Sequence, residues 1–264
     1  MSQPPFRSLP EPVTHVAHLL MESRLMILPA ITFTDVTYRV AGKLIVPPLT
    51  LTLTEARIGI VGQNGSGKTT LLRLIAGLIA PSSGQVRVGG IDPSGDRKGL
   101  VAALGILFQN PDHQILFPTV AEEIAFGLHQ LGEADPEGRA LAILAQHGRS
   151  HWAGAATHTL SQGQRHYLCL MAVLAMAPTT ILLDEPFAGL DLPSQARLKR
   201  SFADLPQRLV TITHDPAVVA HYDRVLWLHA GAVVADGLPD LVLPGFGAAM
   251  AERGGADADT DLAG

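Results

Sequence analysis

The sequence predicts an α/β fold built on a mainly parallel β-sheet. Short apolar, strand-like runs alternate with longer helix-like segments through most of the chain, which is the pattern of strands joined by crossover helices. A glycine-rich turn stands between one of these runs and the helix-like segment after it. The chain has 264 residues, of which 47% are hydrophobic, so it can bury a sizeable core.

The folded domain is expected to span residues 26–238. Residues 1–25 contain four prolines and no sustained hydrophobic period, so we expect a disordered extension there. The runs ITFTDVTYRV (31–40) and LTLTEARIGIV (51–61) alternate like half-buried strands, with a turn at Ala41-Gly42 between them. An antiparallel β-hairpin near the start of the domain follows from this pattern.

Four strand-like runs, each followed by a helix-like segment, make up the rest of the domain. The pairs are IGIVG with KTTLLRLIAGLIA, AALGILFQ with TVAEEIAFGLHQL, TILLDEP with SQARLKRSFADL, and RLVTITHD with PAVVAHY. Residues 239–264 are rich in Gly, Ala and Asp, and we expect them to form a flexible tail.

The composition narrows the classes of function. A net charge of −5 disfavours sequence-independent binding of nucleic acid. Charged residues make up 16%, below the roughly 25% of ordinary soluble domains, which suggests that part of the surface is covered by a partner. No apolar run reaches the roughly 18 residues of a spanning helix, and the single cysteine, Cys169, is expected to be a buried small hydrophobe.

The segment GIVGQNGSGKTT carries the most specific motif, G-x-x-x-x-G-K-[ST], with a strand before it and a helix after it. Glycines let backbone N–H groups surround phosphates, Lys68 reaches the outer phosphates, and the Thr69 hydroxyl can bind Mg²⁺. The predicted nucleotide-binding residues of this loop are Gly62, Asn64, Gly65, Ser66, Gly67, Lys68, Thr69 and Thr70.

A pair of carboxylates follows the apolar run Thr180–Leu183, at the edge of the sheet where parallel sheets bind ligands. Together with a phosphate-binding loop, the pair can divide the work: Asp184 completes the Mg²⁺ shell and Glu185 polarises the attacking water.

The pentapeptide LSQGQ (160–164) stands directly before an apolar helix-like run. A Ser-x-Gly turn at a helix N-terminus is a second anion site. It is not expected to reach the phosphate loop of its own chain, so we expect it to serve the nucleotide of another subunit.

The order of GQNGSGKTT, Gln109, LSQGQ, ILLDEP, AGLD and His214 resembles the nucleotide-binding subunit of ATP-binding-cassette (ABC) transporters, over roughly residues 31–237. The resemblance implies an ATPase with a P-loop NTPase (RecA-like) core. It also implies an N-terminal antiparallel β subdomain and an inserted α-helical subdomain, at about 110–177, that carries LSQGQ.

The same resemblance implies roles for single residues. Catalysis would involve Glu185, with Gln109 sensing Mg²⁺ and water and His214 contacting the γ-phosphate; Thr69, Gln109 and Asp184 would hold the metal. Across a head-to-tail dimer, expected to be a homodimer, the contacts to ATP would come from Ser161, Gly163, Gln164 and Asp191.

Two positions depart from the family pattern. Gln162 stands where the commonest signature has a second glycine, which is tolerable if its φ is negative. Val40 stands where the family usually stacks an aromatic residue on adenine, with Tyr38 two residues earlier, and we expect an apolar contact from Val40.

The segment FQNPDHQILFPTVAEEIAFG resembles the corresponding region of energy-coupling-factor (ECF) importers. Residues 112–117 would then line a groove for a transmembrane T subunit, beside a substrate-binding S subunit, with Glu122 and Glu123 facing that interface or solvent. The chain would lie on the cytoplasmic face of the inner membrane. The amino-acid sequence of its signature region looks most like that of ATPases of biotin transport. ATPases of cobalt or nickel transport are the close alternative, and a soluble ABC ATPase such as an iron–sulfur assembly factor stays open.

Overall fold

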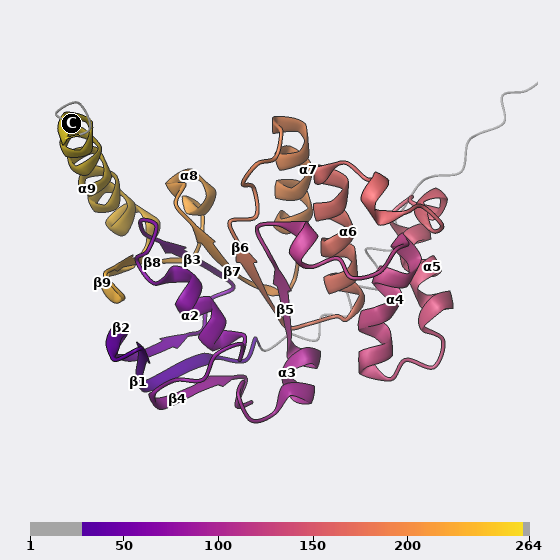
Figure 1. Ribbon diagram of the computed structural model, residues 1–264, viewed down its shortest axis with the longest axis horizontal. Coiled ribbons are helices and arrows are strands. Elements are labelled where there is room, and N and C mark those ends of the chain that lie inside the picture. Colours follow the sequence, from indigo (N-terminus) through magenta and orange to yellow (C-terminus); the bar gives the residue numbers. More distant parts are fainter. Residues whose placement is uncertain (1–27, 261–264) are drawn as a thin grey trace, which may run out of the picture.

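The computed structural model describes residues 28–260, with side chains through residue 252. Two sheets form the frame (Figure 1). The antiparallel sheet has the order β2-β1-β4, with β1 at Ile31–Val40, β2 at Lys43–Leu53 and β4 at Ser83–Val88. The larger sheet has the order β5-β6-β7-β3-β8-β9 and is parallel except for β9 at its edge. The predicted α/β class and its antiparallel subdomain are confirmed.

The remaining elements follow the predicted alternation. The strands of the larger sheet are β3 (Arg57–Val61), β5 (Leu104–Leu107), β6 (Thr180–Asp184), β7 (Arg208–Thr213), β8 (Arg224–His229) and β9 (Ala232–Gly237). The α-helices are α2 (Lys68–Ile75), α3 (Arg97–Ala103), α4 (Val120–Leu131), α5 (Pro136–Gln146), α6 (Gln162–Ala175), α7 (Leu192–Ala203), α8 (Pro216–Val219) and α9 (Pro239–Thr260). Short 3-10 turns occupy Pro111–His113, Ser150–Trp152 and Thr157–Thr159.

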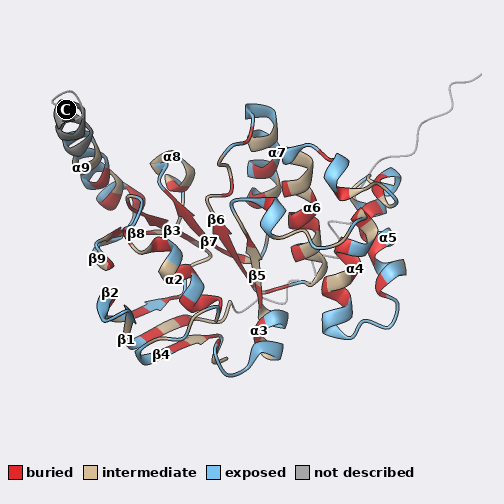
Figure 2. Cartoon of the chain, in the orientation of Figure 1, coloured by how far each residue is buried: buried red, intermediate tan, exposed pale blue. Residues whose placement is uncertain are grey.

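Helix α2 lies between the two sheets (Figure 1) and is buried on several sides (Figure 2). Its apolar residues Leu71, Leu72, Leu74 and Ile75 are at most 1% exposed and join one core with residues of both sheets. Full burial of one apolar side chain stabilises the folded state by about 1.5–3 kcal/mol, so these four residues hold the helix firmly between the two sheets. Its N-terminus, which follows the glycine-rich turn, is therefore fixed in position.

Helices α4, α5 and α6 form a group at one end of the molecule (Figure 1). They have a core of their own, which includes Ile124, Leu144, Trp152 and Leu168. Another face of α6 contacts the central sheet, where Cys169 and Leu170 pack with residues of β6 and α7. Cys169 is fully buried, as expected, and burial raises the pKa of its thiol. Helix α6 thus connects this helical group to the sheet.

The C-terminal segment differs from our expectation of a flexible tail. Residues Pro239–Thr260 form α9, and Val242 and Phe246 are 3% and 1% exposed. Phe246 packs edge-on against Trp227 of β8, with ring centroids 5.9 Å apart. The Gly- and Ala-rich composition hid these two anchoring side chains. The predicted extension at 1–25 lies outside the described residues, and no described helix is long and apolar enough to span a membrane.

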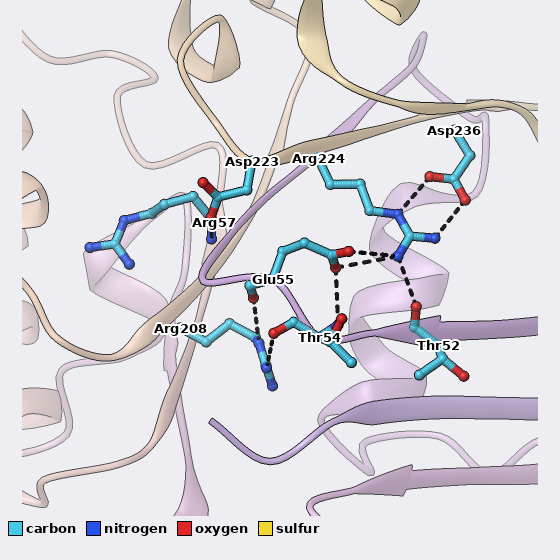
Figure 3. Close-up of polar contacts among 8 residues, drawn as sticks. All are labelled: Thr52, Thr54, Glu55, Arg57, Arg208, Asp223, Arg224 and Asp236. Carbon is cyan, nitrogen blue, oxygen red and sulfur yellow. Dashed lines mark hydrogen bonds and ion pairs between the residues drawn. The ribbon is translucent and has the colours of Figure 1, made fainter. Parts of the chain in front are cut away.

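An ion-pair network ties the two sheets together on the side shown in Figure 3. Arg224 of β8 forms a bidentate pair with Asp236 of β9, at 2.6 and 2.7 Å. Its Nη1 also donates to the Glu55 carboxylate at 3.1 Å and to the backbone carbonyl of Thr52 in β2 at 2.9 Å. Bidentate pairs of this kind fix geometry as well as adding attraction. The network therefore sets how β2 sits on the edge of the parallel sheet.

A second arginine, Arg208, is fully buried at the start of β7 and donates to backbone carbonyls (Figure 3). Its Nε donates to Glu55 at 2.7 Å, and its Nη2 donates to Thr54 at 2.8 Å and to Leu28 at 3.1 Å. Nη1 donates to the carbonyl of Pro29. Only a guanidinium offers donors in so many directions. Arg208 thus joins the chain entering β1 and the end of β2 to the central sheet.

Replacing Arg208 with Lys should lower the free energy of unfolding by about 2–4 kcal/mol, because one ammonium cannot satisfy carbonyls on several sides and buried acceptors would lose their donors. Arg200→Lys is the matched control, since Arg200 is exposed on α7 and the same change there should cost less than about 0.5 kcal/mol. Denaturant unfolding of both variants measures the difference. Equal stabilities would contradict a structural role for the buried guanidinium.

Candidate functional site

The glycine-rich turn connects β3 directly to the N-terminus of α2. Gly67, the N-cap of α2, has φ 101°, a left-handed conformation that favours glycine. A Cβ at Gly62 would lie 2.5 Å from the Leu228 carbonyl oxygen and 2.5 Å from Ser66 Oγ, so a side chain has no room there. The turn therefore brings its backbone close around a hollow at a helix N-terminus, a favourable place for phosphate.

Lys68 is buried within this turn, and only 6% of its surface is exposed. Its Nζ donates to the carbonyl oxygens of Gly62, at 2.6 Å, and Gln63, at 3.0 Å. Burial lowers the pKa of Lys68, whereas the negative charges of Glu185 and Asp184 act in the opposite direction. The Lys68 ammonium is thus held by neutral carbonyl oxygens at the mouth of the hollow. From there its side chain can rotate to bind an anion.

The hollow is a cavity of about 390 Å³ that brings together most of the predicted site. Its predicted lining residues are Asn64, Gly65, Ser66, Gly67, Lys68, Thr69, Thr70, Gln109, Asp184 and Glu185. Three further lining residues were missed: Ile45 of β2, Arg73 of α2 and Ile212 of β7. Arg73 was within reach of the sequence, because it follows Thr69 and Thr70 by one helical turn and so shares their face.

The two carboxylates stand at the end of β6, as predicted. Burial and the neighbouring charge of Glu185 raise the pKa of Asp184, which Lys68 and Arg73 partly offset. Glu185 has φ 47°, an uncommon conformation for a residue with a side chain, and its backbone N–H donates to the Ile212 carbonyl at 2.9 Å. Strain of this kind costs about 1–3 kcal/mol and concentrates at functional sites.

The Glu185 carboxylate is held by residues at the end of β7. His214 Nδ1 lies 2.9 Å from Glu185 Oε1, and the Thr213 hydroxyl donates to Oε2 at 3.2 Å. The His214 side chain is 65% exposed, so its other nitrogen faces outward. Parallel pairing of β6 and β7 places these residues side by side, a contact between Glu185 and His214 that was not predicted from the sequence.

The oxygen donors at the cavity suit Mg²⁺. Thr69, Gln109 and Asp184 supply a hydroxyl, an amide and a carboxylate to one cavity, and Mg²⁺ prefers such ligands together with phosphate oxygens. Burial first, and then the charge of Glu185, raises the pKa of Asp184, and a bound divalent cation would favour the ionised carboxylate. The donor set therefore fits the predicted metal.

The signature residues do not line this cavity. Ser161 is the N-cap of α6 and forms a capping box with Gln164: the Ser161 N–H donates to Oε1 of Gln164 at 2.7 Å, and the Gln164 N–H donates to Ser161 Oγ at 3.3 Å. Ser161 is exposed. A Cβ on Gly163 would lie 2.3 Å from Ser194 Oγ of α7, which explains the glycine. These residues thus present an exposed helix N-terminus away from the phosphate loop of the same chain.

Asp191 and Gln162 lie near this helix N-terminus. Asp191 is the exposed N-cap of α7, where its carboxylate accepts the Ser194 N–H at 2.9 Å. The Gln162 side chain reaches Gly189, whose φ is 72° and whose Cβ would lie 3.0 Å from Gln162 Nε2. Gln162 belongs to helix α6, so its backbone has the negative φ that its side chain requires.

Val40, from which we expect an apolar contact with adenine, does not line the phosphate cavity. Val40 is 50% exposed and lies outside the lining, whereas Ile45, across the hairpin, is part of it. Tyr38 packs partly buried against the main core. Strand β1 carries register shifts around Tyr38, and each shift changes which side chains share a face.

The segment after Gln109 also differs in detail from expectation. Leu116 is 69% exposed, but Phe117 turns inward and stacks on Phe126 with ring centroids 5.0 Å apart. Glu123 is buried, and its Oε2 accepts the backbone N–H groups of Leu116 and Phe117 at 2.8 and 2.9 Å. Glu123 therefore holds this segment in place and does not face an interface or solvent as expected. Glu122 forms a capping box with Thr119.

Comparison with known proteins identifies relatives across most of the chain. Residues 48–188 match the family model described as ABC transporter. The chain is 52% identical over 223 residues to the biotin transport ATP-binding protein BioM of Rhodobacter capsulatus, covering 84% of this chain and 95% of the relative. It is 44% identical to BioM of Rhizobium etli, covering 72% of this chain and 85% of the relative.

A solved structure gives the same result for the fold. The structure of cbiO1 from Clostridium perfringens, described as part of the ABC transporter complex cbiONQ, has a TM-score of 0.70 and 29% sequence identity. The match covers 81% of this chain and 90% of that chain.

Replacing Asp184 with Asn should raise the melting temperature of the nucleotide-free chain by about 2–5 °C at pH 7 while weakening Mg²⁺-dependent ATP binding. A raised pKa means that the folded chain holds this proton more tightly than the unfolded chain. The ionised carboxylate therefore costs stability above its pKa, and the cost disappears as the pH falls below the ordinary carboxyl value.

Melting curves from pH 7 down through the carboxyl range, with and without Mg-ATP, measure both effects. Asp204→Asn is the control, because Asp204 is exposed at the end of α7 and outside the cavity. A lower melting temperature for Asp184→Asn at pH 7 would contradict the electrostatic interpretation.

Proposed function

The chain belongs to the ABC transporter family as an ATP-hydrolysing subunit, and we propose that it energises an ECF-type importer whose substrate is biotin. The observation that carries the proposal is the similarity, over most of the chain, to two relatives named for biotin transport. A third relative, 35% identical over 69% of this chain, is the energy-coupling factor transporter ATP-binding protein EcfA of Methanothermobacter thermautotrophicus, whose length the match covers to 62%.

We assign the steps of ATP hydrolysis to the residues around the cavity. Backbone N–H groups of residues 62–67 and the Lys68 ammonium bind the phosphates and balance their charge. Glu185 accepts a proton from the attacking water, and its contact with His214 orients the carboxylate for that transfer. Mg²⁺, held by Thr69, Gln109 and Asp184, would neutralise charge on the phosphate oxygens.

The exposed signature residues support a head-to-tail homodimer. Ser161 and Gly163 lie outside the phosphate cavity of their own chain, and the N-terminus of α6 carries partial positive charge suited to a phosphate. We propose that Ser161, Gly163, Gln164 and Asp191 of each chain complete the site of the other. Two such composite sites would form in one dimer.

The membrane partners are proposed to be a T subunit and a substrate-binding S subunit. The T subunit would contact the segment 110–117, where Leu116 presents an exposed apolar side chain beside the exposed Asp112. Docking would place the chain on the cytoplasmic face of the inner membrane without a span of its own. Substrate selection would belong to the S subunit, because the chain's own cavity is built for phosphate.

A cobalt or nickel importer is the second candidate. One observation favours it, namely the structural similarity to cbiO1, which belongs to a complex named cbiONQ. Identity to that protein is 29%, against 52% and 44% for the relatives named for biotin transport. Sequence similarity therefore ranks biotin first.

Glu185→Gln should lower kcat for ATP hydrolysis at least about 100-fold with ATP binding retained, because an amide cannot accept the proton of water. Glu252→Gln, on the exposed part of α9, is the matched control and should keep normal turnover. Steady-state ATPase assays of the assembled complex, combined with equilibrium nucleotide binding, separate the two effects. Near-normal turnover in Glu185→Gln would exclude this residue as the proton acceptor.

Leu116→Glu should weaken assembly with the membrane subunits at least about tenfold, since a charge would enter an apolar contact. Leu241→Glu makes the same change on α9, where Leu241 is 76% exposed, and should leave assembly unchanged. Copurification from membranes and nucleotide binding by the isolated chain are the two measurements. Intact assembly of Leu116→Glu would rule out docking at this segment.

Deleting this ATPase from its host should abolish high-affinity uptake of radiolabelled biotin and leave uptake of cobalt and nickel ions intact. Complementation with the intact gene should restore biotin uptake, and a Lys68→Ala version should not. The opposite pattern, normal biotin uptake with loss of metal-ion uptake, would move the assignment to the second candidate.

A further inference from the structure

His166 is a fully buried histidine. It is not among the predicted site residues, and it does not line the cavity at the phosphate loop. It lies on α6, one turn after Gln162. Its Nε2 lies 3.1 Å from the backbone oxygen of Gln109, and its Nδ1 lies 3.2 Å from the backbone oxygen of Gln162. The ring thus stands between the start of α6 and the segment that leaves β5.

Only one of these two carbonyls can receive a hydrogen from a neutral ring. A carbonyl oxygen only accepts, so each of the two contacts needs a hydrogen on the ring nitrogen that makes it, and a neutral ring carries one N–H. The Gln162 carbonyl already faces the backbone N–H of His166 in the helical pattern of α6. The Gln109 carbonyl lies beyond β5 and outside any helix. The proton is therefore best placed on Nε2, where it bonds to Gln109.

A second contact joins the same two segments one residue earlier. Arg165 Nε and Asp112 Oδ1 form an ion pair at 3.0 Å, without the alignment of a hydrogen bond. The Asp112 side chain is 59% exposed, so water weakens this pair. Arg165 and Asp112 are also the charged groups that act on His166. Of the two contacts, the buried one from His166 is the more directional.

Packing fills only part of the space between these segments. A cavity of about 420 Å³ lies there, lined by Gln109, Asn110, Asp112, Gln162, Arg165, Ala188 and Gly189. Because few side chains pack between the two segments there, the buried hydrogen bond between His166 and Gln109 contributes strongly to the position of the segment after β5 relative to α6.

We propose that His166 is a positioning residue whose Nε2–H holds the Gln109 carbonyl against the start of α6. Movement imposed on segment 110–117 is then passed through this bond to Ser161 at the N-terminus of α6, and so to the nucleotide of the second chain. The proposal rests on the proposed function, because the movement comes from a membrane partner.

Two amide substitutions separate this role from simple packing. In His166→Gln the side-chain amide can reach the place of Nε2, whereas the shorter His166→Asn places its amide near Nδ1 and cannot reach Gln109. With the complete membrane complex, His166→Asn should lower kcat for ATP about tenfold with KM within about twofold, and His166→Gln should stay within about twofold of wild type. Equal kinetics for Asn, Gln and wild type, or equal losses in Asn and Gln, would overturn the proposal.

A spectroscopic measurement on the wild-type chain reports the protonated ring nitrogen of His166 and does not depend on the Asn variant. Nitrogen-15 NMR of labelled histidines, with His166→Gln used to assign the signal, reports which ring nitrogen is protonated. We expect the Nε2–H form, and an Nδ1–H signal would overturn the proposal even if Asn substitution impairs folding.

ATPase stimulation by the membrane subunits and hydrogen exchange of the isolated chain distinguish a failure of this inference from a failure of the proposed function. If wild-type ATPase gains nothing from the membrane subunits, the importer assignment fails. Hydrogen exchange of the intact chain then decides the link: His166→Asn should speed exchange in residues 109–114 and His166→Gln should not. Equal exchange in the two variants would overturn the link.

Discussion

Parallel hydrogen bonding between β6, β7 and β3 is the interaction on which the site depends. In this register Asp184 pairs with Ile212, and Val61 pairs with Thr213, so the three strands end at one edge. The next residue of each chain segment is then Glu185, His214 or Gly62. Because parallel strands present their carboxyl ends together, a shift of one residue in either pairing would separate these groups.

The edge that results carries an electrostatic imbalance. Lys68 is held by two carbonyl oxygens, whereas Asp184 and Glu185 bring two carboxylates to the same cavity, where burial and the charge of Glu185 raise the pKa of Asp184. Phosphates together with a divalent cation would engage both kinds of group at once. The outward-facing Ser161 does not contribute to this cavity within its own chain. Each chain thus carries two complementary half-sites, which is the physical basis of the head-to-tail pair that we propose.

Local patterns in the sequence were sufficient for the α/β fold, for the phosphate loop and for the position of Asp184 and Glu185 at a strand end. Such features follow from strand periodicity and from residues adjacent to strand ends. The contacts of Arg208, Glu123 and His166 were not predictable, because each side chain bonds to backbone groups, which have no side-chain signature, and those of Arg208 and His166 are distant in sequence. The position of Val40 outside the phosphate cavity was not predictable either, because register shifts in β1 interrupt the alternation from which its face was inferred. Helix α9 was missed because two anchors, Val242 and Phe246, lie in a Gly- and Ala-rich segment.

Mixed dimers test the composite site most directly. Chains carrying Ser161→Arg and chains carrying Lys68→Ala are combined with the membrane subunits, each variant bearing a different affinity tag so that only mixed pairs are isolated. If Ser161 of one chain serves Lys68 of the other, one site in the mixed pair has both residues intact. We predict ATP turnover at least about tenfold above that of either variant paired with itself. Turnover no higher than the mean of the two variant pairs would show that the two residues do not meet across chains.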